Sequence, residues 1–111
     1  MRDDRERLLD IAEAIDRINR RVGTAADEFE QNEMLQVWVV HHLEIIGEAA
    51  RGLSEEFRLS HPGYDWSRPI GLRNVLAHQY FEVDLGAVWP VVEKDLPELK
   101  LAIDAALGEA T

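Results

Sequence analysis

Apolar residues recur at three- and four-residue steps along most of the chain, which is the spacing of one face of an α-helix. A first helix is predicted over residues 3–22, with the stripe Leu8, Ile11, Ile15, Ile18 and Val22. A second is predicted over 33–53, with the face Leu35, Trp38, His42, Ile45, Ala49 and Leu53. Asn32 is the predicted N-cap of this helix. Close approach of a neighbouring helix is the simplest reason for Gly47 inside it.

Shorter helices are predicted where polar capping residues precede short apolar patterns. Thr24 and Asp27 have the spacing of a capping box, so residues 25–30 are expected to form one helical turn. Ser54 is expected to cap a short helix that ends near residue 60, and residues 61–66 are expected to form a loop. A further helix is predicted over residues 68–79, with Ser67 as its cap and Pro69 in its first turn.

The last predicted helix covers residues 85–107, with Asp84 as its N-cap. Its apolar stripe consists of Leu85, Val88, Val92, Leu96, Leu99 and Ile103. Pro90 and Pro97 interrupt it, and each removes a backbone donor, so we expect bends or a break into two pieces.

These patterns predict an all-α fold, because no segment alternates convincingly between apolar and polar residues. Four substantial helices with short connections favour an antiparallel four-helix bundle with short additional helical turns. With 111 residues, the chain is long enough to bury one core, and we expect a single domain over residues 1–111.

Composition narrows the possible functions. The chain has no cysteine, so disulfides and thiolate metal sites are excluded. We expect no signal peptide and no membrane span, and hence a soluble, cytoplasmic protein. The net charge of −10 argues against a broad nucleic-acid-binding surface. Residues 54–81 nevertheless hold Arg58, Arg68 and Arg73 against only three acids, so any anion site should be local.

The run RNVLAHQY places Arg73, Asn74, His78 and Tyr80 within eight residues. Arginine binds phosphate bidentately, and histidine transfers protons near neutral pH. This combination suggests metal-independent RNA cleavage, in which the neighbouring 2′-hydroxyl attacks the phosphate. Arg73 would hold the phosphate, His78 would act as acid or base, and Tyr80 would contact substrate or assist proton transfer. The alternative is that arginine and histidine are solvated or capping residues of a surface helix.

The spacing limits how one chain could build this site. Arg73 and His78 point about 140° apart on a regular helix, whereas Asn74 and His78 share a face. The arginine could reach round the helix, the helix could end before His78, or a second copy could supply the other half. We favour the last arrangement, a twofold dimer in which both chains line one cleft.

Other histidines and acids are weaker candidates. The adjacent residues His41 and His42 diverge by about 100°, so one should be packed and the other exposed. His61 is expected in a loop, and we expect no metal or other cofactor. Glu44 and Glu48 could form a paired acid site, but a solvated helix side is the commoner arrangement.

Aromatic residues are expected mainly in the core or at interfaces. Stacking of a base on an exposed Trp66 or Tyr64 is the alternative that bears on RNA binding.

The chain resembles the HepT-like proteins of the HEPN superfamily over nearly its whole length. The resemblance lies in RERLLDIAEAIDRI, in LEIIGEAARGLSEEFR followed by HP, in GLRNVLAHQYFEVDLGAVW and in DLPELK. Its most specific element is arginine, four residues, histidine, any residue, tyrosine, which occurs here as Arg73, His78 and Tyr80. Gln79 stands where relatives often have glycine and would narrow the cleft, and Pro90 is a second departure.

The resemblance implies a helical bundle that forms a homodimer with a composite cleft. It implies that Arg73 and His78 are the ribonuclease residues of a toxin in a toxin–antitoxin pair. The partner would be a minimal nucleotidyltransferase antitoxin that transfers AMP to Tyr80, which would place negative charge beside the phosphate-binding arginine. Two alternatives remain open: a non-catalytic helical module that binds such a transferase and is modified by it, and a plain dimerisation domain.

Overall fold

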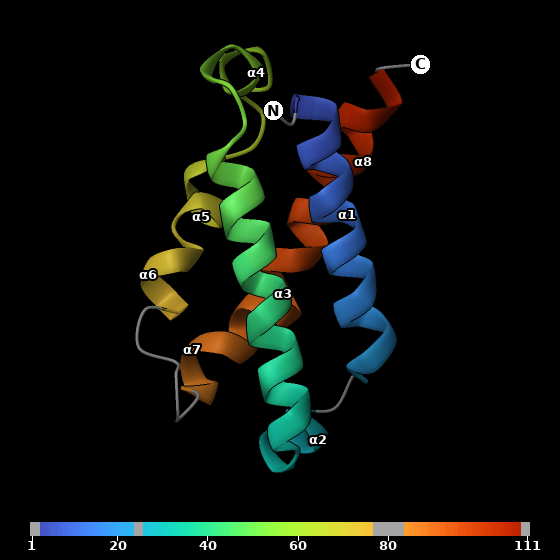
Figure 1. Cartoon of the computed structure of the whole chain (residues 1–111), viewed down its shortest axis with the longest axis vertical. Coiled ribbons are helices and arrows are strands. Elements are labelled where there is room, and N and C mark those ends of the chain that lie inside the picture. Colours follow the sequence, from blue (N-terminus) through green and yellow to red (C-terminus); the bar gives the residue numbers. More distant parts are fainter. Residues whose placement is uncertain (1–2, 24–25, 77–83, 110–111) are drawn as a thin grey trace.

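Two long helices, α1 (Asp4–Arg21) and α3 (Glu33–Arg51), run antiparallel along the length of the fold (Figure 1). They are the helices predicted over residues 3–22 and 33–53. This computed structural model of the chain describes residues 3–23, 26–76 and 84–109. Every regular element in these ranges is helical, which confirms the all-α prediction. No helix in the described ranges is long and apolar enough to cross a membrane.

The C-terminal part of the bundle consists of three consecutive segments: α7 (Leu85–Pro90), the π-helical η1 (Val91–Asp95) and α8 (Leu96–Glu109). The helix is therefore irregular where the prolines predicted it, but a π-helical segment joins its two α-helical parts and the chain does not break into two pieces. In η1 the Leu96 N–H donates to the Val91 carbonyl, five residues back. In a regular α-helix the ring of Pro97 would collide with the carbonyl four residues earlier, and the wider π turn relieves that crowding.

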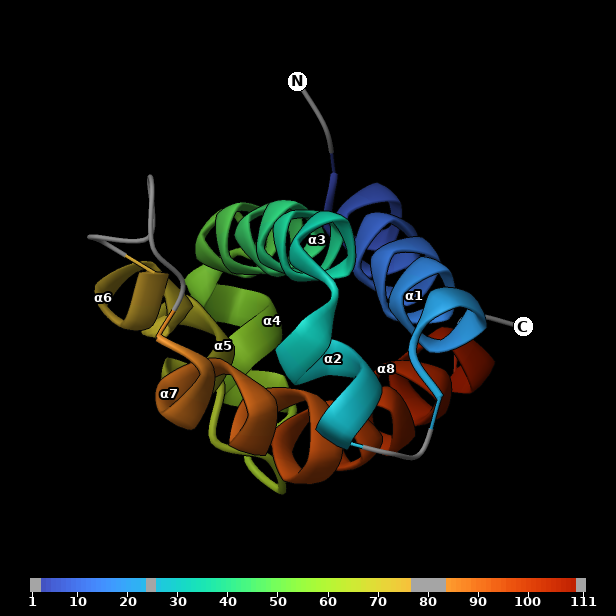
Figure 2. The same cartoon turned by 90° about the horizontal axis from the view of Figure 1, so that it is seen from below.

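The fourth member of the bundle is the pair α5 (Ser67–Ile70) and α6 (Leu72–Leu76), which packs on α3 (Figure 2). The prediction of one continuous helix from residue 68 was wrong, because the chain turns at Gly71. The Gly71 N–H bonds to the Ser67 carbonyl at 2.9 Å, and the Asn74 N–H bonds to the Gly71 carbonyl at 3.0 Å. The second bond spans only three residues, so it closes a tighter turn than an α-helix does. Residues 77–79 of the predicted helix lie outside the described ranges.

The predicted caps are mostly confirmed. Asn32, Ser54 and Asp84 accept hydrogen bonds from the backbone three residues ahead, at 3.0, 3.0 and 3.2 Å. They begin α3, α4 (Glu55–Ser60) and α7. Ser67 as a cap was wrong, because Asp65 instead accepts from the Ser67 N–H at 3.1 Å.

A short helix, α2 (Ala26–Gln31), occupies the region of the predicted turn over residues 25–30, and the Thr24 end of its expected capping box lies outside the described residues. A capping box between Asp3 and Glu6 begins α1 and was not predicted.

The core combines side chains from both ends of the chain. Its fully buried large members include Phe29, Ile11, Ile15, Ile18, Leu43, Ile46, Leu96 and Ile103. Ile45 was predicted on the buried face of the second helix, and this was wrong: it is 36% exposed. Trp38 is half-buried, and its indole N–H donates to the Arg17 carbonyl at 3.2 Å, which links α3 to α1.

Candidate active site

The short helix α6 presents Arg73 and Asn74 to solvent. Leu72 and Leu76, four residues apart, are both buried and anchor α6 to the core, while Arg73 and Asn74 between them are exposed. At Gly47, a methyl group would lie 3.5 Å from the Leu72 Cβ and 4.0 Å from the Arg73 backbone nitrogen. The predicted close approach at Gly47 is thus confirmed, although the contact leaves room for a methyl group.

Of the three arginines between residues 54 and 81, Arg73 is the one best placed to bind an anion. Arg68 is already neutralised, because its guanidinium bonds to Glu98 at 2.7 Å and to Asp95 at 2.5 Å. These hydrogen bonds, first that to Glu98, raise the pKa of Arg68 above its usual value. Arg58 is half-buried. Arg73 is exposed and makes no ion pair with any described residue.

The remaining motif residues, His78, Gln79 and Tyr80, lie outside the described residues. The structure therefore brings Arg73 and Asn74 together on α6, and the geometry between Arg73 and His78 stays a prediction. The shared dimer cleft stays a prediction as well.

The two adjacent histidines of α3 divide as predicted. His42 is buried, and its Nδ1 donates to the Trp38 carbonyl at 2.7 Å. His41 is exposed, and its ring meets that of His42 edge-on with 5.1 Å between ring centres. His61 follows α4 as predicted, with its ring stacked on Phe57 at 4.2 Å between ring centres.

Glu44 and Glu48 are both exposed on α3. Glu44 stands three residues before Gly47, so it lies near the edge of the contact between α3 and α6. Neither carboxylate forms an ion pair or a hydrogen bond within the described ranges. This arrangement indicates that Glu44 and Glu48 belong to the solvated side of α3 and do not form a paired acid site. Across the described residues, no group of three or more histidine, aspartate or glutamate side chains is arranged to hold a metal ion.

The alternative of an exposed Trp66 that stacks on a base is wrong, because this side chain is only 5% exposed and belongs to the core, as mainly expected. Its indole N–H donates to the His61 carbonyl at 2.9 Å, so the tryptophan closes the loop onto the core. Tyr64 packs its ring edge against Trp66 with 4.9 Å between ring centres. Partial burial raises the pKa of Tyr64.

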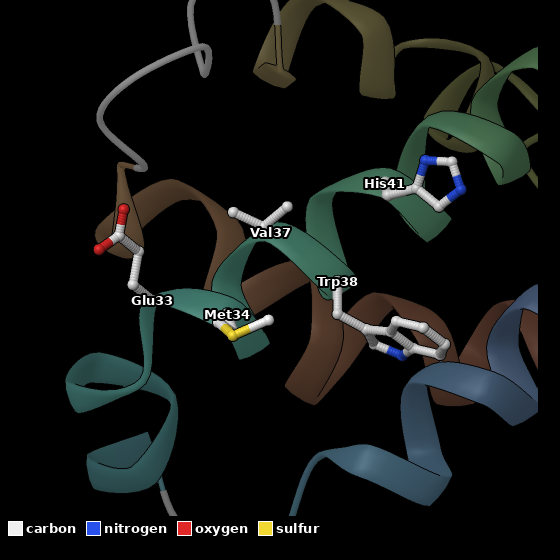
Figure 3. Close-up of a pocket in the computed structure, with 5 residues that line it drawn as sticks. All are labelled: Glu33, Met34, Val37, Trp38 and His41. Atoms are coloured by element: carbon white, nitrogen blue, oxygen red, sulfur yellow. The ribbon is translucent and has the colours of Figure 1, made fainter.

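A hollow of about 360 Å³ on the outer face of α3 was not foreseen from the sequence. It is lined by Glu33, Met34, Val37, Trp38 and His41 (Figure 3). The available signal was the pair of apolar residues Met34 and Val37, three positions apart, which lie on a different side of the helix from the buried stripe.

Comparison with known proteins finds a family model described as "Ribonuclease HepT-like", which matches residues 11–106. "Probable ribonuclease HepT" of Thermococcus cleftensis is 36% identical over 100 residues, covering 89% of this chain and 91% of the relative. "Putative RNase MJ1380" of Methanocaldococcus jannaschii is 40% identical over 78 residues, covering 70% of this chain and 72% of the relative. "Putative RNase TTE0752" of Caldanaerobacter subterraneus is 36% identical over 90 residues, covering 81% of this chain and 80% of the relative. No solved structure matches.

Proposed function

The chain belongs to the HepT-like ribonuclease family, and we propose that it is a metal-independent endoribonuclease whose site includes Arg73 and His78. The observation that supports this most directly is the exposed Arg73, which no described carboxylate neutralises, inside the region matched by the family model. Such a guanidinium is available for a phosphate, whereas the neighbouring Arg68 is not.

The proposed reaction is an internal transfer at phosphorus. The 2′-hydroxyl oxygen attacks the adjacent phosphate, the bond to the 5′-oxygen of the next nucleotide breaks, and the products are a 2′,3′-cyclic phosphate and a 5′-hydroxyl end. One histidine accepts the proton of the 2′-hydroxyl, and an acid protonates the leaving oxygen. Arg73 stabilises the negative charge that grows on the phosphate oxygens. Asn74, exposed beside Arg73, supports the bound substrate.

We place this site in a homodimer, because the side chains of Arg73 and His78 would point about 140° apart on a regular helix. Two copies of α6 on either side of one cleft would supply an arginine from one chain and a histidine from the other. This arrangement also gives the reaction both an acid and a base.

The biological setting that we propose is a toxin–antitoxin pair in the cytoplasm. A minimal nucleotidyltransferase partner would neutralise the toxin by transferring AMP to Tyr80. The phenol oxygen would attack the α-phosphate of ATP, pyrophosphate would leave, and the phenol proton would pass to a base. The added phosphate would then compete with RNA for Arg73.

RNA cleavage is tested with purified protein in the presence of a metal chelator. We expect cleavage by the wild type with cyclic phosphate ends, its loss in His78→Ala and a large decrease in Arg73→Ala. Arg20→Ala is the matched control for loss of a surface arginine, because Arg20 pairs with Asp16 on α1. Equal cleavage by wild type and His78→Ala would overturn the proposal.

The net charge of the chain, −10, favours a second candidate function, because a strongly acidic protein is poorly suited to bind RNA. In this alternative, the chain is a non-catalytic module that binds the transferase and serves as its substrate. Co-expression with a neighbouring nucleotidyltransferase gene, followed by mass spectrometry, tests the modification. Because Tyr64 is the other tyrosine, Tyr64→Phe should keep the AMP addition and Tyr80→Phe should lose it. AMP on Tyr80 without RNA cleavage by unmodified protein would favour the second candidate.

A further inference from the structure

The hollow on α3 has the geometry of a helix-packing hole. Four of its lining residues, Met34, Val37, Trp38 and His41, stand at positions i, i+3, i+4 and i+7. Four side chains at this spacing form the hole that receives one side chain of a facing helix. Met34 and Val37 are 83% and 59% exposed, so no described part of the chain covers them. Figure 3 shows them projecting from the outer surface of α3.

We propose that a second copy of this chain fills the hollow, with the two α3 helices antiparallel and a twofold axis beside His41. In this register, a residue before His41 faces the residue equally far after it in the other copy. Ile45 of the second copy then stands opposite Val37 and inserts into the hollow. Ile45 is 36% exposed in the single chain, and the symmetry forms the same contact twice.

The antiparallel orientation follows from the position of α6. This helix packs on one flank of α3, and α1 packs on the other (Figure 2). An antiparallel pair places both copies of α6 on the same side of the two α3 helices, whereas a parallel pair places them on opposite sides. The choice of a second copy in this orientation rests on the proposed function, which requires one cleft between two copies of α6.

Charge complementarity supports the same register. Glu33 and Arg51 are both exposed, and neither forms an ion pair within the described part of the chain. They are eighteen residues apart, which is five full turns, so they project in the same direction from α3. In the antiparallel register, Glu33 of one copy comes within about 3 Å of the level of Arg51 of the other along the helix axis. A parallel pair brings no such partners together.

The chain contains no cysteine, so introduced cysteines report the register directly. Facing helices 8–10 Å apart bring Cα atoms at the twofold axis close enough for a disulfide. His41→Cys should therefore form a disulfide-linked dimer under mild oxidation. Val37→Cys alone should not, because its two copies are about 12 Å apart along the axis. The double variant Val37→Cys, Ile45→Cys should cross-link, and Leu101→Cys, on the exposed side of α8, should not.

Cross-linking of Val37→Cys alone would indicate a different register and overturn the proposal. A dimer in which His41→Cys fails to cross-link would do the same, since another face would then carry the contact. A monomeric wild type in light scattering would also overturn it, and would leave the hollow to RNA or a partner protein.

Substitution of the exposed side chains tests the interface without cysteines. Val37→Arg should halve the mass measured by light scattering, from dimer to monomer, whereas Leu101→Arg should leave the dimer intact. Circular dichroism of both variants should match the wild type, because both positions are exposed. Arg51→Glu should weaken the dimer, and the added Glu33→Arg should restore it. A dimer that Val37→Arg does not dissociate would contradict the proposal.

These measurements contain no RNA, so they separate the interface from the activity. The expected cross-links without RNA cleavage would uphold the interface and reject the ribonuclease function. Cleavage by a protein that lacks these cross-links would reject the interface and leave the ribonuclease function standing.

Discussion

Asp4 and Ser54 are fifty positions apart, yet the carboxylate of Asp4 accepts two hydrogen bonds from Ser54. The Ser54 N–H donates at 2.8 Å, and the Ser54 hydroxyl donates at 2.6 Å. The same hydroxyl oxygen accepts from the Phe57 N–H and caps α4. The start of α1 thus holds the start of α4 in place at one end of the bundle.

Loss of this carboxylate should destabilise the fold. Hydrogen bonds to charged groups contribute roughly 1.5–3 kcal/mol, so Asp4→Ala should lower the free energy of unfolding by about that amount. Asp16→Ala is the matched control, because Asp16 forms an exposed pair with Arg20 on the same helix and should cost less than about 1 kcal/mol. Urea denaturation measures both, and equal losses would contradict the role assigned to Asp4.

Gly47 should tolerate alanine. The added methyl would lie 3.5 Å from the Leu72 Cβ and from the Pro69 carbonyl oxygen, which is ordinary contact distance. In a helix interior, alanine is also more favourable than glycine by about 1 kcal/mol. Thermal unfolding should show Gly47→Ala equal to or more stable than the wild type. Gly47→Leu should be less stable by roughly 1–3 kcal/mol, because the larger side chain has no room between α3 and α6.

Two neighbouring arginines should differ sharply in RNA cleavage. Removal of one group that stabilises transition-state charge costs about 10²–10³-fold in rate, so Arg73→Ala should lose activity by that factor. Arg68→Ala should keep most of its activity, because Asp95 and Glu98 already bind this guanidinium. Single-turnover cleavage assays compare the two. Similar losses in both variants would mean that the positive charge of the whole segment matters, and not Arg73 in particular.

Asp65 should report its contact with Ser67 in an acid titration. Hydrogen bonds from Ser67, first from its hydroxyl and then from its backbone, lower the pKa of Asp65. A lowered folded-state pKa contributes stability above the unfolded value, near 4, and this contribution is lost as the pH falls through the folded value. Ser67→Ala should raise the pKa of Asp65 toward its ordinary value, as measured by NMR. Ser60→Ala should leave it unchanged, because the Ser60 hydroxyl bonds to the Phe57 carbonyl instead.

The residues of the candidate site were predicted from the sequence, because their chemistry lies within one short run. The exposure of Arg73 and Asn74 follows from the buried Leu72 and Leu76 on either side of them. The availability of Arg73 for an anion could not be derived in this way. It depends on which arginine meets carboxylates from a distant segment, and Asp95 and Glu98 meet Arg68.

The sequence by itself determined the two long helices, the N-caps at Asn32, Ser54 and Asp84, and an irregularity near Pro90 and Pro97, because these depend on residues within one or two turns of each other. The tertiary structure decided the features that depend on distant segments. In the folded chain Ile45 is exposed and Trp66 is buried. Asp4 is hydrogen-bonded to Ser54, and no described segment covers the hollow on α3. Helical periodicity identifies apolar stripes, but the packing of neighbouring helices decides which stripe is buried and which remains free for another molecule.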